Sequence, residues 1–163
     1  MKPHRVYLAL GANIAPMKAN IDKACLLLAT KIDDIKMAPV YETKPWGFED
    51  QENFLNTALR GDTDLTPEEL LEFTQEVERE VGRVKRFQNG PREIDIDILL
   101  YDDVVLNTPR LQVPHPRMHE RDFALQPLAD LDEDLVHPVL GVSVRDLLRD
   151  LKGERYVIKT YEE

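Results

Sequence analysis

Very little in this sequence points to a secreted, membrane-spanning or cysteine-rich protein. The 163 residues include one cysteine, Cys25, so the chain has no internal disulfide and no cysteine-rich zinc site. No apolar run approaches the ~18 residues of a membrane helix. The N-terminal segment has too short an apolar run for a signal peptide. We therefore expect a cytoplasmic protein that does not bind membranes.

Positive charge is also scarce. Lysine and arginine number 21 against 31 aspartate and glutamate residues, which gives a formal net charge of −10. Proteins that bind nucleic acid or anionic membranes generally present a basic face, so we expect neither partner. A local basic site for a small anion remains compatible with this charge. The length fits a single domain, residues 1–163, with one hydrophobic core.

Several well-known nucleotide-binding motifs are missing. The chain has no Walker A sequence and no two glycines separated by one residue, which excludes a P-loop and a dinucleotide-binding fingerprint. The protein-kinase signature is absent too. His115 and His119 lie four residues apart, but no third ligand lies near them in sequence, so zinc is a weak alternative there.

Hydrophobic periodicity predicts a mixed fold. Apolar residues at helical spacing predict a helix from Pro16 to about Ile32, and Thr66 and Gly82 are typical of the start and stop of a second helix. Alternation predicts strands over 5–10, 35–41, 54–59 and 93–101. The order β-α-β-β-α-β is typical of a ferredoxin-like α+β sandwich with an antiparallel sheet and helices on one face. We also expect a C-terminal helical extension, with a helix opening at Ser143 and a short strand over 156–161.

The most informative segment is Gly90–Leu100. Its alternation places three isoleucines on one face of the strand and Asp95 and Asp97 on the other. The two carboxylates would lie roughly 6.6 Å apart along the strand, where each disfavours ionisation of the other unless a cation lies between them. Magnesium suits such a site, because it is usually held by one or two carboxylates together with substrate phosphates. The alternative is a solvated strand face whose charges prevent edge pairing.

A cluster of cations precedes the acidic pair. Between Gly82 and Arg92 the sequence has no acidic residue and four basic ones, Arg83, Lys85, Arg86 and Arg92. Such a loop suits a mobile lid on phosphate groups, although an ordinary solvated loop would look similar. A basic loop leading into a pair of carboxylates indicates a nucleoside triphosphate site.

Two further loops gather aromatic and polar side chains. Residues 43–48 and 54–56 contain three aromatic residues, a threonine and an asparagine, a composition that suits stacking on a flat heterocycle. The alternative is that Trp46 and Phe48 merely cover the end of the sheet. The second loop, residues 113–123, brings His115, Arg117 and Arg121 near Phe123. The alternative is that Arg121 pairs with Glu120 or Asp122 on the surface.

Six ordered motifs in this chain resemble those of the 6-hydroxymethyl-7,8-dihydropterin pyrophosphokinase family. The resemblance covers nearly the whole chain and rests on Leu10-Gly11-Ala12-Asn13, Tyr41-Glu42-Thr43-Lys44-Pro45-Trp46-Gly47, Phe54-Leu55-Asn56, Gly82-Arg83-Val84-Lys85, Gly90-Pro91-Arg92-Glu93-Ile94-Asp95-Ile96-Asp97 and Val113-Pro114-His115. It implies a ferredoxin-like, ATP-dependent enzyme of folate biosynthesis. Such enzymes transfer pyrophosphate from MgATP to the hydroxymethyl oxygen of the pterin and release AMP.

The resemblance also implies roles for individual residues. Asp95 and Asp97 would ligate two Mg²⁺ ions, and these two residues with Arg83, Lys85 and Arg92 would form the catalytic set. The ATP-binding residues would be Gln75, Glu78, Arg83, Lys85, Arg92, Ile98, His115 and Arg121. The pterin-binding residues would be Asn13, Thr43, Pro45, Trp46, Phe54, Asn56 and Phe123. Lys85, Asn89 and Pro116 depart from the residues common in the family, which affects the expected contacts of the lid. We expect a monomer.

Two other functions remain open from the residues themselves. A nucleotidyl transferase or cyclase also uses two strand carboxylates and two metal ions, but it would release pyrophosphate instead of AMP. An RNA-recognition domain shares the order of elements, yet its aromatic strand motif is missing here and the net charge of −10 opposes it.

Overall fold

A computed structural model describes residues 3–162 of the chain. Its elements follow one another in this order: β1 (His4–Ala12), α1 (Met17–Leu28), β2 (Asp33–Met37), β3 (Tyr41–Thr43), β4 (Phe54–Thr63), α2 (Pro67–Val81), β5 (Asp95–Tyr101), β6 (Leu106–Asn107), β7 (Gln112–Val113), the 3-10 helix η1 (Met118–Glu120), α3 (Asp122–Asp132), α4 (Val144–Arg149) and β8 (Val157–Thr160).

A six-stranded sheet forms the centre of the molecule. Its strand order is β5-β1-β4-β3-β8, and β2 pairs with β4 beside this path. Every pair in it is antiparallel, and the long central pair β1–β4 sets Leu8 opposite Leu59. This arrangement confirms the ferredoxin-like α+β sandwich.

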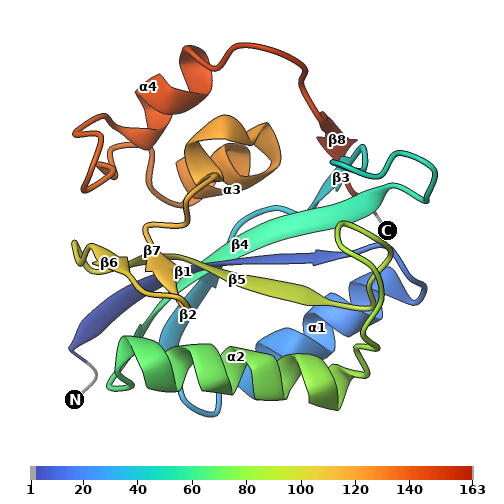
Figure 1. The fold of residues 1–163 in the computed structure, drawn as a ribbon, viewed down its shortest axis with the longest axis horizontal. Coiled ribbons are helices and arrows are strands. Elements are labelled where there is room, and N and C mark those ends of the chain that lie inside the picture. The colour runs from blue at the N-terminus through green and yellow to red at the C-terminus, as the bar shows by residue number, and fades with distance from the viewer. Residues whose placement is uncertain (1–2, 163) are drawn as a thin grey trace.

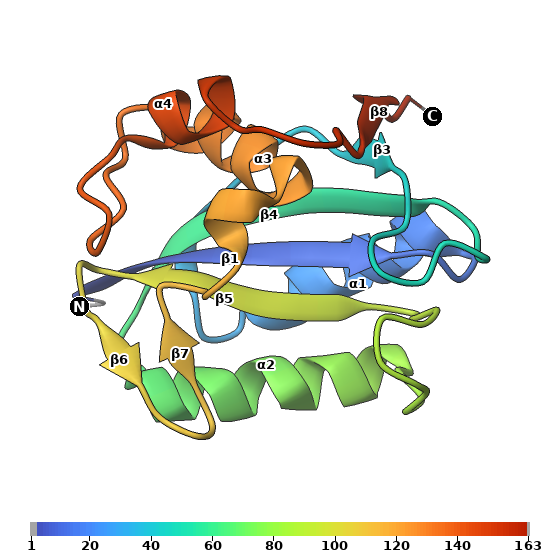
Figure 2. The same cartoon turned by 45° about the horizontal axis from the view of Figure 1, so that its top comes forward.

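The two faces of the sheet carry different layers. On β1, Val6, Leu8 and Leu10 belong to the core that α1 and α2 cover, whereas Tyr7 and Ala9 belong to a second core together with α3. Figures 1 and 2 show α1 and α2 on one side of the sheet and α3 and α4 on the other. The C-terminal extension therefore adds a third layer on the face that the predicted sandwich leaves open.

The second helix begins and ends as the sequence predicts. The hydroxyl of Thr66 accepts a hydrogen bond from the Glu69 backbone N–H at 3.2 Å, and the Glu69 carboxylate accepts one from the Thr66 N–H at 2.9 Å. These reciprocal bonds form a capping box. Gly82 ends the helix with φ = 117°, a left-handed conformation that glycine adopts without strain.

Other elements differ from the predictions. The strand expected over 35–41 is divided into β2 and β3, because Pro39 has no N–H to donate to a sheet ladder. The first helix ends at Leu28, so Ile32 is buried from the turn that follows it. Helix α3 was not predicted, because it has Pro127 in its interior and no side-chain cap, and an interior proline normally indicates a break.

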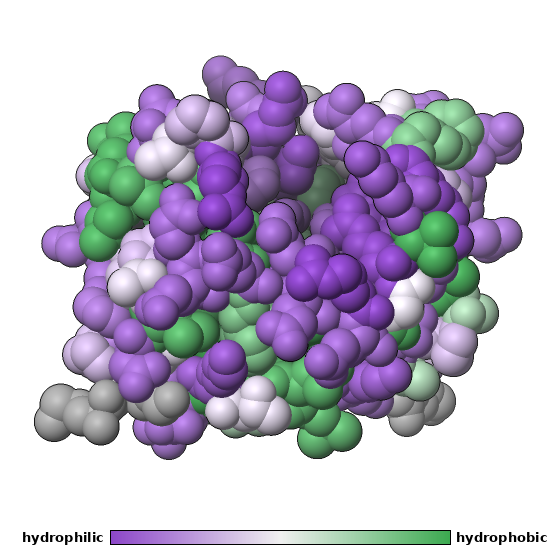
Figure 3. Space-filling model, turned by 60° about the horizontal axis from the view of Figure 1, so that its bottom comes forward, coloured by the Kyte–Doolittle hydropathy of each residue, from purple (hydrophilic) through white to green (hydrophobic). Residues whose placement is uncertain are grey.

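The surface is largely polar. Figure 3, which brings the α2 side of the molecule forward, shows a mostly hydrophilic face on which apolar side chains form separate patches. Within residues 3–162, no helix has both the length and the apolar character that crossing a bilayer requires.

Candidate active site

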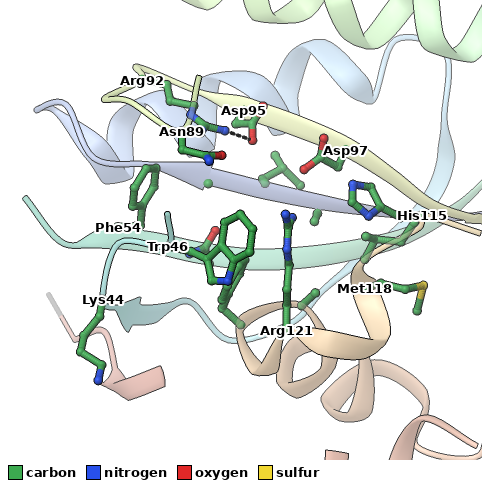
Figure 4. Close-up of a pocket in the computed structure, with 17 residues that line it drawn as sticks. Lys44, Trp46, Phe54, Asn89, Arg92, Asp95, Asp97, His115, Met118 and Arg121 are labelled. Atoms are coloured by element: carbon green, nitrogen blue, oxygen red, sulfur yellow. Dashed lines mark hydrogen bonds and ion pairs between the residues drawn. The ribbon is translucent and has the colours of Figure 1, made fainter. Parts of the chain in front are cut away.

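A cavity of about 80 Å³ lies between the sheet and the start of α3 (Figure 4). Strand β5 contributes Asp95 and Asp97, and β4 contributes Phe54 and Asn56. The opposite wall comes from the loop that carries Trp46 and from the segment around η1 and α3. The remaining lining residues are Ala9, Leu10, Gly11, Lys44, Asn89, Arg92, Leu99, His115, Met118, Arg121, Phe123 and Ala124.

Two arginines neutralise Asp95. Its carboxylate accepts a hydrogen bond from Arg92 Nη1 at 2.6 Å and another from Arg83 Nη1 at 3.0 Å. The same Nη1 of Arg83 donates to Glu78 Oε2 at 2.7 Å. Arg83 therefore bridges α2 and β5 through two acidic residues.

Glu78 is a buried member of this network. Its residue is 8% exposed, and its Oε2 also accepts the backbone N–H of Ile96 at 2.8 Å. Burial raises the pKa of the Glu78 carboxyl, while the bond from Ile96 and the charge of Arg83 oppose that effect. Glu78 thus fixes the end of α2 to the strand that carries the acidic pair.

Asp97 has different surroundings from Asp95. Among the residues that the structure describes, none donates a hydrogen bond to the Asp97 carboxylate. Burial, and then the charge of Asp95, raises the pKa of Asp97 to about 7, against a smaller opposing effect of Arg121. Because bringing a cation close would favour the ionised form of both groups, this pair of carboxylates suits a divalent cation.

The donor set agrees with magnesium better than with a metal held by protein alone. Across residues 3–162, no three His, Cys, Asp or Glu side chains gather into a metal-binding group. Magnesium commonly uses one or two carboxylates and completes its octahedron with water and phosphate oxygens. The oxygens of Asp95 and Asp97 therefore fit Mg²⁺ that is shared with a phosphorylated substrate.

His115 and Arg121 supply hydrogen-bond donors to the same cavity. Burial, followed by the charge of Arg121, lowers the pKa of His115 to about 4, so its imidazole is neutral at pH 7. Its Nδ1 accepts the backbone N–H of Arg117 at 3.2 Å, which leaves the proton on Nε2 as a donor. Arg121 Nε is buried without a hydrogen-bond partner.

Arg121 stacks on the aromatic wall. The carbon of its guanidinium lies 4.5 Å from the centroid of the Trp46 ring and 5.6 Å from that of Phe123. Figure 4 shows its side chain rising between Trp46 and His115 toward Asp97. A desolvated guanidinium in this position requires an anionic or aromatic partner.

Asn56 lines the cavity and is held by Thr43. Its Nδ2 donates to the hydroxyl of Thr43 at 2.7 Å, and it lies opposite Gly11 in the β1–β4 register. A Cβ at Gly11 would lie 2.4 Å from Asn56 Oδ1, so only glycine permits this approach. This requirement for Gly11 depends on strand register, which the sequence alone does not reveal.

The structure brings most of the predicted site residues together. Nine line the cavity: Trp46, Phe54, Asn56, Arg92, Asp95, Asp97, His115, Arg121 and Phe123. An adjoining open pocket of about 540 Å³ beside α2 contains four more, which are Gln75, Glu78, Arg83 and Lys85, together with Arg92.

Four predicted residues line neither cavity. Thr43 and Pro45 are buried behind the wall, and Ile98 lies in the core on the α1 and α2 side. Asn13 is also buried; its Oδ1 accepts the Arg92 N–H at 2.9 Å and its Nδ2 donates to Gln51 Oε1 at 2.8 Å. Asn13 and Thr43 therefore contact the site through Arg92 and Asn56.

Paired carboxylates flanked by arginines, beside an aromatic pocket, are typical of enzymes that transfer phosphoryl groups from nucleotides. Residues 7–133 match the family model described as 7,8-dihydro-6-hydroxymethylpterin-pyrophosphokinase, or HPPK. The chain belongs to this family, as its sequence motifs indicate.

Individual relatives agree with this assignment. The chain is 47% identical over 149 residues to the 2-amino-4-hydroxy-6-hydroxymethyldihydropteridine pyrophosphokinase of Aquifex aeolicus, covering 91% of each chain. It is 46% identical over 127 residues to the protein of the same name from Bacillus subtilis, covering 77% of this chain and 76% of that one.

The fold matches solved structures of longer proteins. Plasmodium falciparum HPPK-DHPS with pteroate superposes with a TM-score of 0.73 at 17% identity, covering 91% of this chain and 42% of that one. The chain thus spans less than half the length of that protein. At this identity the likeness concerns the fold alone.

Proposed function

We propose that the cavity between β5 and α3 is where this pyrophosphokinase acts on its two substrates. There it transfers the pyrophosphoryl group of MgATP to the hydroxymethyl oxygen of 6-hydroxymethyl-7,8-dihydropterin and releases AMP, in folate biosynthesis. The observation that carries the proposal is the position of Asp95 and Asp97, side by side on β5 and facing a cavity with an aromatic opposite wall.

Asp95 and Asp97 would hold two Mg²⁺ ions against the phosphates of ATP. When bound, the metal would neutralise charge on the attacking and leaving oxygens. Arg83 and Arg92 already lie on Asp95, so their guanidiniums are close to the phosphate site and would donate to phosphate oxygens as charge develops during the transfer. With Lys85 from the same loop, these residues form the proposed catalytic set.

The remaining polar residues would orient ATP. Neutral His115 would donate through Nε2 to a phosphate oxygen, and another phosphate oxygen would accept the hydrogen bond for which the buried Nε of Arg121 has no partner. Gln75, Glu78 and Ile98 complete the proposed ATP set. Glu78 and Ile98 are buried, so their contribution would be to shape the strand and helix beside the nucleotide.

The aromatic side of the cavity would receive the pterin. Trp46, Phe54 and Phe123 offer ring faces for stacking, and the Asn56 amide, oriented by Thr43, offers a donor and an acceptor to the edge of the heterocycle. Pro45 and Asn13 support this wall from behind.

A pair of carboxylate variants tests the proposal. Asp95→Asn and Asp97→Asn should each abolish turnover, because each removes one proposed metal ligand and no core contact. Asp103→Asn, an exposed acid just beyond β5, is the matched control and should retain wild-type activity. Near wild-type activity of either site variant at saturating Mg²⁺ would contradict the metal assignment.

We also propose that the enzyme is a monomer, because one chain supplies every proposed site residue. The net charge of −10 supports the further proposal of a cytoplasmic protein without nucleic-acid or membrane partners. Sedimentation equilibrium should give a mass near 18.8 kDa, and a mass twice as large would contradict the monomer.

A further inference from the structure

Asp122 is a buried acid between two residues of the cavity. It is 3% exposed, and its neighbours in sequence, Arg121 and Phe123, both line the cavity. It is the first residue of α3, yet α3 has no side-chain cap. The Asp122 carboxylate is directed away from its own helix.

The partners of Asp122 are the first residue of β8 and the residue before it. Oδ2 accepts the backbone N–H of Tyr156 at 2.8 Å and that of Val157 at 2.9 Å, while Oδ1 is buried without a hydrogen-bond partner. A buried carboxylate is costly unless it is well paired. The hydrogen bonds from Tyr156 and Val157 therefore offset the cost of burying this carboxylate.

Residues 154–157, which lead into β8, also contact β3 and the loop that carries Trp46. Lys44 N donates to the Tyr156 carbonyl at 2.8 Å, and Lys44 Nζ forms an ion pair with Glu154 at 2.7 Å. Thr43 is paired with Val157 in the β3–β8 ladder. Figures 1 and 2 both show β8 next to β3.

Aromatic packing extends this connection. The rings of Tyr156 and Phe123 meet edge to face with centroids 6.0 Å apart. Residues 154–157 thus contact the loop before Trp46 on one side and the start of α3 on the other. Because Thr43 is also paired with Phe54 in the β3–β4 ladder, these contacts connect Phe54 with Phe123.

We propose that Asp122 is a positioning residue for the pterin, which through residues 154–157 and β3 sets the spacing between Phe54 and Phe123. This inference rests on the proposed function, because it assumes that Phe54 and Phe123 receive the heterocycle. Without the Asp122 carboxylate these two residues lose their common anchor, and stacking on both sides of a flat ring would be weakened. A residue that only stabilised α3 would alter the melting temperature and leave substrate affinity unchanged.

The experiment compares Asp122→Ala, Asp122→Asn and Thr63→Ala with the wild type. Thr63 is the matched control: it is fully buried and holds two backbone groups, Lys31 O and Leu65 N, at the end of β4 remote from Asn56. KM for the pterin, KM for ATP, kcat and the melting temperature are measured for each, at a temperature where every variant is folded. The pterin dissociation constant is measured with a non-hydrolysable ATP analogue.

We expect D122A to raise the KM and the dissociation constant for the pterin by roughly 10- to 100-fold, the range associated with a misplacement of about 1 Å. D122N should stay within about threefold of the wild type, because one amide oxygen can accept both N–H groups. T63A should lower the melting temperature without changing the pterin KM. If D122A does not fold, D122S takes its place, because it keeps an oxygen at the helix start but is too short to hold both N–H groups.

Folded D122A or D122S with a wild-type pterin KM would overturn the inference, as would T63A raising that KM equally. If the wild-type protein turns over the pterin, the proposed function stands even when the inference about Asp122 fails. A wild-type protein that binds no pterin would overturn both.

Discussion

The carboxylates of Asp95 and Asp97 lie two positions apart on β5 but have different partners. Asp95 is bonded to two guanidiniums, whereas Asp97 has a pKa raised to about 7 by burial and by Asp95. In the absence of metal, Asp97 is therefore protonated in the native protein up to about pH 7. In the unfolded chain it has an ordinary aspartate pKa near 3.8 and is ionised over most of the range from pH 4 to 7.

This difference predicts how stability depends on pH. Because the native state binds more protons between about pH 4 and 7, Asp97 lowers the free energy of unfolding as pH rises from about 4 to about 7. Without Mg²⁺, D97N should exceed the wild type in stability by about 1–2 kcal/mol at pH 8, a value reduced for the partial exposure of the side chain. Below about pH 4, where Asp97 is protonated in both states, the two proteins should be equally stable.

Thermal unfolding at both pH values, with and without Mg²⁺, measures this effect. His115, whose pKa is lowered to about 4, loses stability as pH falls, but it is present in both proteins and cancels. Addition of Mg²⁺ and a nucleotide at pH 8 should stabilise the wild type more than D97N. A wild type more stable than D97N at pH 8 without metal would contradict the account of Asp97.

A second residue-scale prediction uses the single tryptophan of the chain. Arg121 lies over the Trp46 ring at 4.5 Å, and phosphate binding should draw its guanidinium away from the ring. We expect Mg²⁺ and a non-hydrolysable ATP analogue to change the emission of Trp46 in the wild type and to change it far less in R121A. The exposed-arginine control R149A should respond like the wild type.

An R121A protein with the full wild-type fluorescence response would show that Trp46 reports some other motion. Titration of the fluorescence change gives the nucleotide dissociation constant of the wild type. Calorimetry of nucleotide binding to R121A distinguishes a loss of the fluorescence signal from a loss of binding.

At the scale of elements, two sets of ion pairs hold the loop that connects α2 to β5. Arg83 pairs with Glu78 and Asp95, and Arg86 pairs with Glu93. The hydrogen bonds from Arg86 lower the pKa of Glu93 to about 2, so Glu93 is ionised at the pH of an enzymatic assay.

We expect R83A to lower kcat by about 30- to 1000-fold, corresponding to roughly 2–4 kcal/mol, with a smaller effect on the ATP dissociation constant. The reason is that Arg83 starts on Asp95 and would transfer its donors to phosphate as charge develops. Steady-state kinetics combined with calorimetry of ATP binding separate the two effects. A variant changed only in ATP affinity would mean that the loop merely captures the nucleotide.

The elements themselves were predictable to different degrees. Thr66, Pro67 and Gly82 mark α2 by local chemistry alone, and the alternation of Asp95 and Asp97 with isoleucines marks β5. Helix α3 was not predicted, because Pro127 lies in its interior and its start has no side-chain cap. Tertiary packing of Leu125 and Leu128 stabilises this helix instead. Pro39 divided a predicted strand whose two parts both pair with β4.

At the scale of the whole molecule, the site lies between two layers that are distant in sequence. The sheet supplies the carboxylates and Phe54, while the C-terminal layer supplies His115, Arg121 and Phe123. Local spacing revealed the acidic pair and the basic loop. Composition indicated aromatic side chains suited to stacking on a flat heterocycle, but the pterin came from the family resemblance alone. The proximity of these side chains depends on β4, α3 and β8 packing together, so it required the structure, as did the role proposed for Asp122.

The central claim is that two phosphorus atoms move together from ATP to the pterin. The measurement that tests it most directly is phosphorus NMR of the complete reaction with MgATP and 6-hydroxymethyl-7,8-dihydropterin, with the nucleotides quantified after separation. Attack at the β-phosphorus should yield one AMP for each pterin consumed, with the former β and γ phosphates both in the pterin product. Stoichiometric ADP would instead indicate attack at the γ-phosphorus, and stoichiometric free pyrophosphate would indicate attack at the α-phosphorus; either result would contradict the account.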